Sequence, residues 1–407
     1  MSNEYIQLIE RSDTEVDERN LLIKSENENS ISGNEETEIE TVIKPKPTRV
    51  YWVDYLRIFA SVLVVYIHVS FVNVARGKVG EPIWDKIFLH NSLPRHCVPV
   101  FVMISGIFFL NPKKELSFKK LFQKNILHMV KSLFFWSIYY SVFDRFVINY
   151  RHIKFTYDLN LLKTVVYEIF IAPGHFWYVY FVIGLYIATP LYRCITKERI
   201  VAWYAVGISI ILAQLMPTIN NFTRDFFNFT IPVLPDFLNK LSIEYMGNYT
   251  VYYILGYLLY THEFKNKKNV KLICIVGFVS QIITVILRYI ECHKKNRESN
   301  DFGYYNTMFV SLTAIGTFLY FKFYVNEYIE PFMEMRWFKT LVLKLSECSF
   351  GVYLAHMTIY DLLHRYNFVP TTFDPLWWIP IYTVIVYVLT FLFIYLLRLI
   401  PILKQVT

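Results

Sequence analysis

The sequence has few charged residues and few cysteines. Charged residues make up 18% of the chain, below the roughly 25% that is usual for soluble globular proteins. Its 5 cysteines are scattered without a CxxC pair, which favours packed or free thiols. No nucleic-acid-binding module is recognisable, so we expect no nucleic-acid partner. A basic start with a short apolar core and a cleavage site is also missing, so we expect no cleaved signal peptide.

The chain is rich in long apolar runs instead. Hydrophobic residues make up 55% of the 407 residues, and they gather in stretches of about 20 residues, the length of helix that crosses a hydrocarbon layer. These stretches lack the alternation expected of membrane strands. We therefore predict an all-α, polytopic membrane helical bundle with about ten transmembrane helices. The predicted spans are 51–72, 92–111, 126–148, 175–195, 200–219, 243–261, 270–290, 303–325, 344–363 and 376–400.

One apolar segment is too short to span. Residues 161–172 stop at Pro173-Gly174, a pair that ends regular structure. We predict an interfacial or re-entrant segment there, or an extension of the next span, so the number of spans is good to about one.

The charge is divided unequally along the chain. Residues 1–50 hold 12 acidic and 6 basic residues, a net charge of −6, whereas the rest holds 21 acidic and 35 basic residues, a net of +14. We divide the chain into a disordered acidic cytosolic tail, 1–50, and a transmembrane domain, 51–403. With the N-terminus in the cytosol, the inside segments hold 20 Lys and Arg and the outside segments 11. The positive-inside rule then favours a multi-pass protein with both termini cytosolic.

Short motifs bear on the side and the kind of membrane. Asn221-Phe-Thr and Asn228-Phe-Thr are glycosylation sequons in the longest predicted outside loop, and they predict a glycoprotein. The tail holds two short patterns, Tyr5-Ile-Gln-Leu8 and Asp17-Glu-Arg-Asn-Leu21-Leu22. Both match endolysosomal sorting signals and also arise by chance, so the plasma membrane and endolysosomal membranes both stay open.

The first predicted span contains three ionisable residues, Asp54, Arg57 and His68. A charge at membrane depth is costly and marks a functional candidate by default. Arg57 and His68 are 11 residues apart, which is three helical turns plus about 20°, so they share one face roughly 16 Å apart along the axis. Asp54 lies three residues before Arg57 and is placed to pair with it. Two structural alternatives are an interfacial ion pair and a core histidine bonded to a carbonyl.

Asp54 and four further residues are candidates for lining a substrate channel. Ser105 precedes Gly106 near the end of the second span, where a small pair also serves close helix packing. Trp177 opens the fourth span and also fits an interfacial aromatic belt. Tyr353 and His356 are three residues apart on one helical face. No two histidines within a span have metal-like i, i+4 spacing, so we predict no metal site.

Basic residues follow the second span. They provide a topology signal, and they also suit a cytosolic clamp for phosphates, in which lysine acts as a point charge. The candidates are Lys120, Lys124, His128 and Lys131.

In this order and spacing, the motifs resemble the membrane-bound acyltransferase 3 family, which includes bacterial O-acetyltransferases of cell-surface polysaccharides. The resemblance covers about 51–403. Four features carry it: Asp54-Tyr-Leu-Arg57 with ten residues between Arg57 and His68; Val98-Pro-Val-Phe-Val-Met-Ile-Ser-Gly106; His175-Phe-Trp177 leading to Tyr186 and Pro190; and Gly351-Val-Tyr353-Leu-Ala-His356.

The resemblance implies acyl transfer across the membrane. An acyl-CoA, with acetyl-CoA expected, would be a co-substrate from the cytosolic side, with no bound cofactor. Its acyl group would reach a hydroxyl or amine of a glycan or other extracytoplasmic acceptor. His68 would be the essential residue and Arg57 would support the donor end. The family's Arg-x-x-Arg element is replaced by Asn125-Ile-Leu-His128, which keeps basic character without bidentate arginine geometry.

Two other classes of function stay open at this point. A transporter with an intramembrane His/Arg/Asp relay would be favoured by internal repeats and paired broken helices, and we find no convincing repeat between the halves. A catalytically inactive membrane scaffold is the other, because the basic element is altered.

Overall fold

A computed structural model describes residues 49–407 except 149–158, 172, 231–239 and 241–248. The predicted tail, 1–50, lies almost wholly outside the described residues. Within them every regular element is an α-, 3-10 or π-helix, which confirms the all-α prediction. The α-helices are α2 (Tyr51–Arg76), α3 (Pro82–Ser92), α4 (Cys97–Phe109), α5 (Phe118–Lys120), α6 (Leu127–Phe143), α7 (Leu159–Phe170), α8 (Trp177–Lys197), α9 (Arg199–Ser209), α10 (Met216–Phe227), α12 (Thr250–Thr261), α13 (Lys267–Lys295), α14 (Met308–Tyr320), α15 (Asn326–Ile329), α16 (Arg336–Arg365), α17 (Pro375–Leu397) and α18 (Pro401–Lys404).

Several long helices continue through a short turn of different pitch. Local π-turns interrupt α-helices without ending them, and 3-10 turns join consecutive helices. The 3-10 elements are η1 (Leu93–His96), η4 (Gly174–Phe176) and η7 (Glu330–Glu334), and the π elements are η2 (Leu121–Ile126), η3 (Asp144–Ile148), η5 (Ile210–Leu215) and η6 (Phe321–Val325).

Among the described residues, 8 helical stretches are long and apolar enough to cross a membrane. Each overlaps one predicted span, which supports a membrane bundle with an approximate count. The predicted spans 243–261 and 344–363 correspond to α12 and α16. Neither is among the 8 stretches. α12 is too short, with 12 described residues, and α16 has 30 residues but no stretch as apolar as those in the 8. A polar helix fits inside the bundle, and every residue from Cys348 to His356 is buried.

Several helix boundaries differ from the predicted ones; for example, the span predicted as 303–325 is Met308–Glu334. The second span, predicted as 92–111, begins at Pro82, because η1 joins α3 to α4 without a break in the helical path. The helix predicted to end at residue 219 runs on to Phe227. α7 is a helix of 12 residues packed on α6, too short to span by itself. The long apolar stretch Lys163–Lys197 includes most of α7 and all of α8, so a separate segment and an extension of the next span both stay open.

Glycines allow two pairs of helices to cross closely. A Cβ at Gly106 would lie 1.9 Å from the carbonyl oxygen of Tyr253, and one at Gly256 would lie 2.1 Å from that of Met103. α4 and α12 therefore touch backbone to backbone, as small residues permit in membrane helices. The pair Gly277 and Gly316 does the same between α13 and α14.

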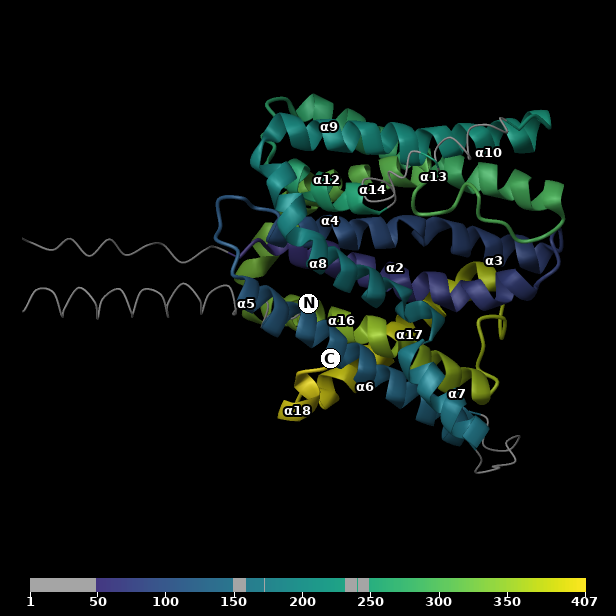
Figure 1. Cartoon of the computed structure of the whole chain (residues 1–407). Helices are drawn as coiled ribbons and strands as arrows, with labels where there is room; N and C mark the ends of the chain where they lie inside the picture. The colour runs from purple at the N-terminus through teal and green to yellow at the C-terminus, as the bar shows by residue number, and fades with distance from the viewer. Residues whose placement is uncertain (1–48, 149–158, 172, 231–239, 241–248) are drawn as a thin grey trace, which may run out of the picture.

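α2 lies inside the bundle, beside α4, α16 and α17. In Figure 1 α9, α10 and α13 form one flank, and α6 and α7 form the other. The Lys339 ammonium sits over the Tyr51 ring, and that of Lys344 sits over Tyr395. The start of α2, the start of α16 and the end of α17 therefore share one end of the bundle. Which compartment faces that end stays a prediction.

Candidate functional site

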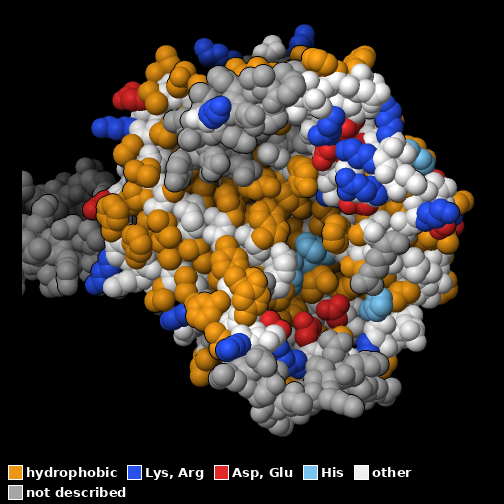
Figure 2. All heavy atoms as spheres, turned by 45° about the vertical axis from the view of Figure 1, so that its right-hand side comes forward, with side chains coloured by type: hydrophobic (Ala, Val, Ile, Leu, Met, Phe, Trp, Pro, Cys, Tyr) orange, Lys and Arg blue, Asp and Glu red, His pale blue; other side chains and the backbone are white. Residues whose placement is uncertain are grey.

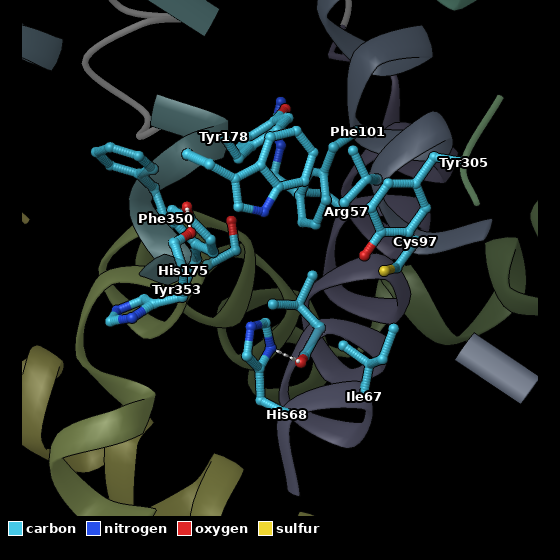
Figure 3. A pocket seen from close by; sticks show the side chains of 14 residues that line it. Arg57, Ile67, His68, Cys97, Phe101, His175, Tyr178, Tyr305, Phe350 and Tyr353 are labelled. Atoms are coloured by element: carbon cyan, nitrogen blue, oxygen red, sulfur yellow. Dashed lines mark hydrogen bonds between the residues drawn. The ribbon is translucent and has the colours of Figure 1, made fainter. Parts of the chain in front are cut away.

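Arg57 and His68 border one pocket, on the face of α2 that turns toward the bundle interior (Figure 3). The pocket encloses about 620 Å³, including the part that opens to solvent. Helices α2, α4, α8 and α16 form its walls, together with η4 and the loop before α14. Most of the lining side chains are aliphatic or aromatic, namely Val64, Ile67, Val98, Phe101, Trp177, Tyr178, Tyr305, Phe350 and Tyr353. The other lining residues are Arg57, His68, Cys97, His175 and Ser349.

The imidazole of His68 is held by its own helix. Its Nδ1 lies 2.8 Å from the carbonyl oxygen of Val64. Because a carbonyl oxygen only accepts, Nδ1 must carry the proton, and Nε2 of the neutral ring then keeps a free lone pair. His68 is half-buried and borders the pocket. The arrangement fixes the tautomer that a general base requires.

Two further histidines pack around His68. The ring centroid of His356 lies 4.8 Å from that of His68, and the centroid of His175 lies 6.2 Å from it. Nδ1 of His356 donates to the carbonyl oxygen of Tyr353 at 2.7 Å. The Nε2 atoms of both His175 and His356 are buried without a hydrogen-bond partner in the described part of the chain. Three imidazoles from α2, η4 and α16 thus meet at one end of the pocket.

Figure 2 views the molecule obliquely, with the end that carries α3, α7 and α10 turned toward the viewer. Histidine side chains are visible in a hollow whose surroundings are largely hydrophobic. An apolar setting of low dielectric constant strengthens the electrostatic interactions inside it.

The other end of the pocket is charged. The guanidinium of Arg49 binds Asp54 through two hydrogen bonds of 2.8 and 3.0 Å, whereas the Arg57 guanidinium lies 3.8 Å from the same carboxylate. Ser346 connects them, because Arg57 donates to its hydroxyl at 3.2 Å and that hydroxyl donates to Asp54 at 2.6 Å. The predicted Asp54–Arg57 pair is therefore present, but Arg49 is the closer partner. Asp54 is not among the lining residues.

The remaining channel candidates divide into two groups. Trp177 and Tyr353 line the pocket, and the hydroxyl of Tyr353 donates to the carbonyl oxygen of His175 at 2.5 Å. His356 contacts the ring of His68 but is not among the described lining residues. Ser105 is fully buried and donates to the carbonyl oxygen of Phe101 at 3.1 Å. Its position, next to the tightly packed Gly106, fits helix packing.

None of the four basic candidates belongs to the described pocket lining. Lys124 and Lys131 are exposed, and Lys120 and His128 are half-buried. They lie on α5, η2 and α6. The ring centroid of His128 is 6.1 Å from that of Phe350, which lines the pocket. A phosphate-binding role for them stays a prediction.

The two sequons differ in the structure. Asn221 lies within α10, not in a loop, and its Nδ2 donates to the carbonyl oxygen of Asp301 at 3.0 Å. Asn228 ends α10 in the left-handed conformation, at φ 51°, and is exposed. The helix extends this far because its apolar pattern continues past the predicted end.

The described residues contain one group of carboxylates close enough to hold a metal ion: Asp225, Glu291 and Asp301. Lys295 lies 2.9 Å from Glu291 and 2.6 Å from Asp301. Arg224 binds Asp225 at 2.7 Å. These cations neutralise the three carboxylates, which therefore form an ion-pair network. That no metal is bound stays a prediction.

Sequence reasoning did not single out His175, Arg49 or Tyr305. His175 was visible only as part of the His175-Phe-Trp177 motif. The other two reach the site through contacts between segments far apart in the sequence.

Comparison with known proteins adds one finding. The acyltransferase domain of the acyltransferase 3 family matches residues 50–395, the region that contains every pocket residue. No curated protein and no solved structure matches the chain. With most of its length matched to that domain, the chain belongs to the acyltransferase 3 family and is a membrane-embedded acyltransferase.

Proposed function

We propose that this enzyme moves an acetyl group from cytosolic acetyl-CoA to a hydroxyl, or an amine, of a glycan or other acceptor on the opposite side of the membrane. The observation that carries the proposal is that Arg57 and His68 border the same pocket. Along a helix these residues are about 16 Å apart. That offset suits a donor that enters from the Arg57 end and an acceptor that meets it at His68.

The tautomer of His68 supports a role as general base. Its Nε2 lone pair takes the proton from the acceptor hydroxyl while the hydroxyl oxygen attacks the thioester carbonyl carbon. The C–S bond then breaks, and the imidazolium returns the proton to the thiolate, which leaves as CoA. Such catalysis contributes about 10²- to 10⁴-fold in rate. A transient acyl group on Nε2 is the alternative, and trapping of labelled protein without an acceptor distinguishes the two.

The donor end would use two kinds of cation. Arg57, held by Ser346 and lying over the Phe108 ring at 5.6 Å, would face the thioester arm. Lys120, Lys124, His128 and Lys131 would attract the phosphates of CoA as point charges. Their place outside the pocket lining suits a long donor whose phosphates stay at the mouth.

We also propose that the end of the bundle with the start of α2 faces the cytosol, together with both termini. The excess of Lys and Arg in the loops at that end supports this orientation. The tail motifs fit an endolysosomal membrane, with the plasma membrane as the alternative. On a lumenal acceptor the product would be an O- or N-acetylated sugar.

The test is reconstitution of the purified full chain in liposomes with radiolabelled acetyl-CoA and a panel of glycans. His68→Ala should lower acceptor labelling by at least about 100-fold, the lower bound for loss of a general base. His364→Ala is the matched control, because His364 is an exposed histidine at the end of α16. It should label acceptors like the wild type.

Other outcomes would contradict the proposal. Flux of a solute without acceptor labelling would indicate a transporter. A wild-type protein that neither labels an acceptor nor moves a solute would indicate an inactive scaffold. Equal labelling by wild type and His68→Ala would remove His68 from the mechanism.

A further inference from the structure

Tyr305 brings a hydroxyl group into the pocket from a loop. It lies between α13 and α14, and its ring stacks on Trp177 with centroids 5.8 Å apart and planes 15° apart. Its carbonyl oxygen accepts a hydrogen bond from the hydroxyl of Tyr252. In Figure 3 the Tyr305 hydroxyl points into the pocket beside the Cys97 thiol. No protein partner for this hydroxyl is found in the described part of the chain.

A buried cation lies behind this wall of the pocket. Arg95, in η1, is 6% exposed, and its Nε donates to the carbonyl oxygen of Asn91 at 3.1 Å. Its Nη2 donates to the side-chain oxygen of the same residue. Arg95 interacts electrostatically with Tyr305 and with His68. One cation therefore acts on two pocket residues.

The charge of Arg95 is not cancelled by an ion pair of its own. Among the described residues no carboxylate lies within ion-pair distance of it. Glu298 interacts with Arg95 at longer range but is bound to the Arg288 guanidinium at 3.2 Å. An uncompensated buried cation is expensive, and in a membrane it marks a functional position. Its charge would favour any negative charge that forms in the pocket.

The hydroxyl of Tyr305 suits a hydrogen-bond donor. Burial raises the pKa of Tyr305 well above its usual range. The group therefore keeps its proton at neutral pH, and with no protein acceptor it is free to donate to a ligand.

We propose that Tyr305 is a catalytic residue whose O–H binds the carbonyl oxygen of the acyl thioester across the pocket from His68, with Arg95 as the positioning cation behind it. The inference rests on the proposed acyl-CoA donor. When the acceptor oxygen attacks, the C–O bond forms and the carbonyl electron pair moves to oxygen, where Tyr305 stabilises the negative charge. The pair then returns, the C–S bond breaks, and the thiolate takes the proton held by His68.

Tyr305→Phe tests this directly, since it keeps the ring and its stack on Trp177 and removes only the hydroxyl. We expect kcat to fall by about 10²- to 10³-fold, as for loss of one oxyanion donor, with little change in KM for either substrate. The control is Tyr304→Phe, at a neighbouring tyrosine that is 55% exposed, and it should keep wild-type kcat. A Tyr305→Phe enzyme with wild-type kcat would overturn the inference.

A spectroscopic measurement separates this role from a packing role. Acetyl-CoA labelled with ¹³C at the carbonyl, bound to His68→Ala protein, should show a C=O stretch lowered by the hydrogen bond. Adding Tyr305→Phe should return the stretch toward its value in water-free solvent. Arg95→Gln should shift it in the same direction, and Arg95→Lys should shift it less because the charge remains. A stretch that is identical in all four proteins would overturn the inference.

The outcomes also separate this inference from the proposed function. Acetyl transfer that needs His68 but not the Tyr305 hydroxyl would refute only the role of Tyr305. No acetyl transfer by the wild-type protein would refute the proposed function and, with it, the role of Tyr305.

Discussion

The ring of His356 on α16 meets the ring of His68 on α2 edge to face, with centroids 4.8 Å apart and planes 64° apart. His356 is 1% exposed, and its Nδ1 is anchored to the carbonyl oxygen of Tyr353. The contact limits rotation of the His68 ring, whose Nδ1 is hydrogen-bonded to the carbonyl oxygen of Val64. The proposed base is therefore held by its own helix, α2, and by α16.

We expect His356→Ala to lower acetyl transfer by about 10²-fold, the cost of a small misplacement of a reacting group. His356→Phe fills the same space and should recover part of that loss. The radiolabel assay measures both, with thermal unfolding as the check on folding. A Phe variant as inactive as the Ala variant would mean that the buried Nε2, not the packing, is what His68 requires.

The carboxylate of Asp54 should be a major contributor to stability. It is 2% exposed and lies within 4 Å of two guanidiniums, those of Arg49 and Arg57. Asp54→Asn leaves both cations without their carboxylate, and breaking a buried pair from one side costs about 3–5 kcal/mol. A markedly lower thermal unfolding temperature in detergent is expected.

The matched control for Asp54→Asn is Glu327→Gln, which breaks an exposed pair. Lys267 and Glu327 are 3.4 Å apart with side chains 81% and 70% exposed, and such pairs contribute about 0–1 kcal/mol. Equal unfolding temperatures for the two variants would contradict the account of Asp54.

The position of Arg57 and His68 on one face of α2 was predictable from the sequence, because both residues belong to one helix and helical periodicity fixes their relative direction. The all-α bundle was predictable for a similar reason, since apolar runs of this length have few alternatives in a membrane. The contribution of His175 was not, because its place beside His68 depends on how the 3-10 turn η4 meets α2 and α16. Arg49 and Tyr305 lie outside the helices that bear the motifs, and no local pattern shows where such residues point.

Gly106 should be required for packing, not for chemistry. A Cβ there would lie 1.9 Å from the carbonyl oxygen of Tyr253, so Gly106→Ala forces α4 and α12 apart. Overpacking of this kind costs about 1–3 kcal/mol, which thermal unfolding of the purified protein would report. Gly184→Ala on α8 is the control, because no atom lies within 4 Å of the added Cβ. A Gly106→Ala protein as stable as Gly184→Ala would show that the helices separate without cost.

Lys124 and Lys131 should contribute to donor affinity if they attract the phosphates of CoA. Each is exposed, so each substitution to Ala should raise KM for acetyl-CoA by only about 2- to 5-fold, in line with screened surface charges. The effect should shrink as ionic strength rises, while kcat changes little. Lys267→Ala, which removes another exposed lysine, should leave KM unchanged. A KM that is insensitive to both lysines and to salt would exclude them from the donor site.

Asn228, not Asn221, should carry the glycan when the protein is made in a eukaryotic cell. Attachment requires an accessible side-chain amide in a chain segment that the enzyme can reach. Asn228 is exposed at the end of α10, whereas the Nδ2 of Asn221 already donates to Asp301 within a helix. Treatment with a glycosidase should raise the gel mobility of the wild type and of Asn221→Gln, but not that of Asn228→Gln.

Sugar on Asn221 alone would mean that α10 is not yet formed when the glycan is attached. Sugar on neither would remove this support for an extracytoplasmic end at α10 and for the transfer direction proposed above.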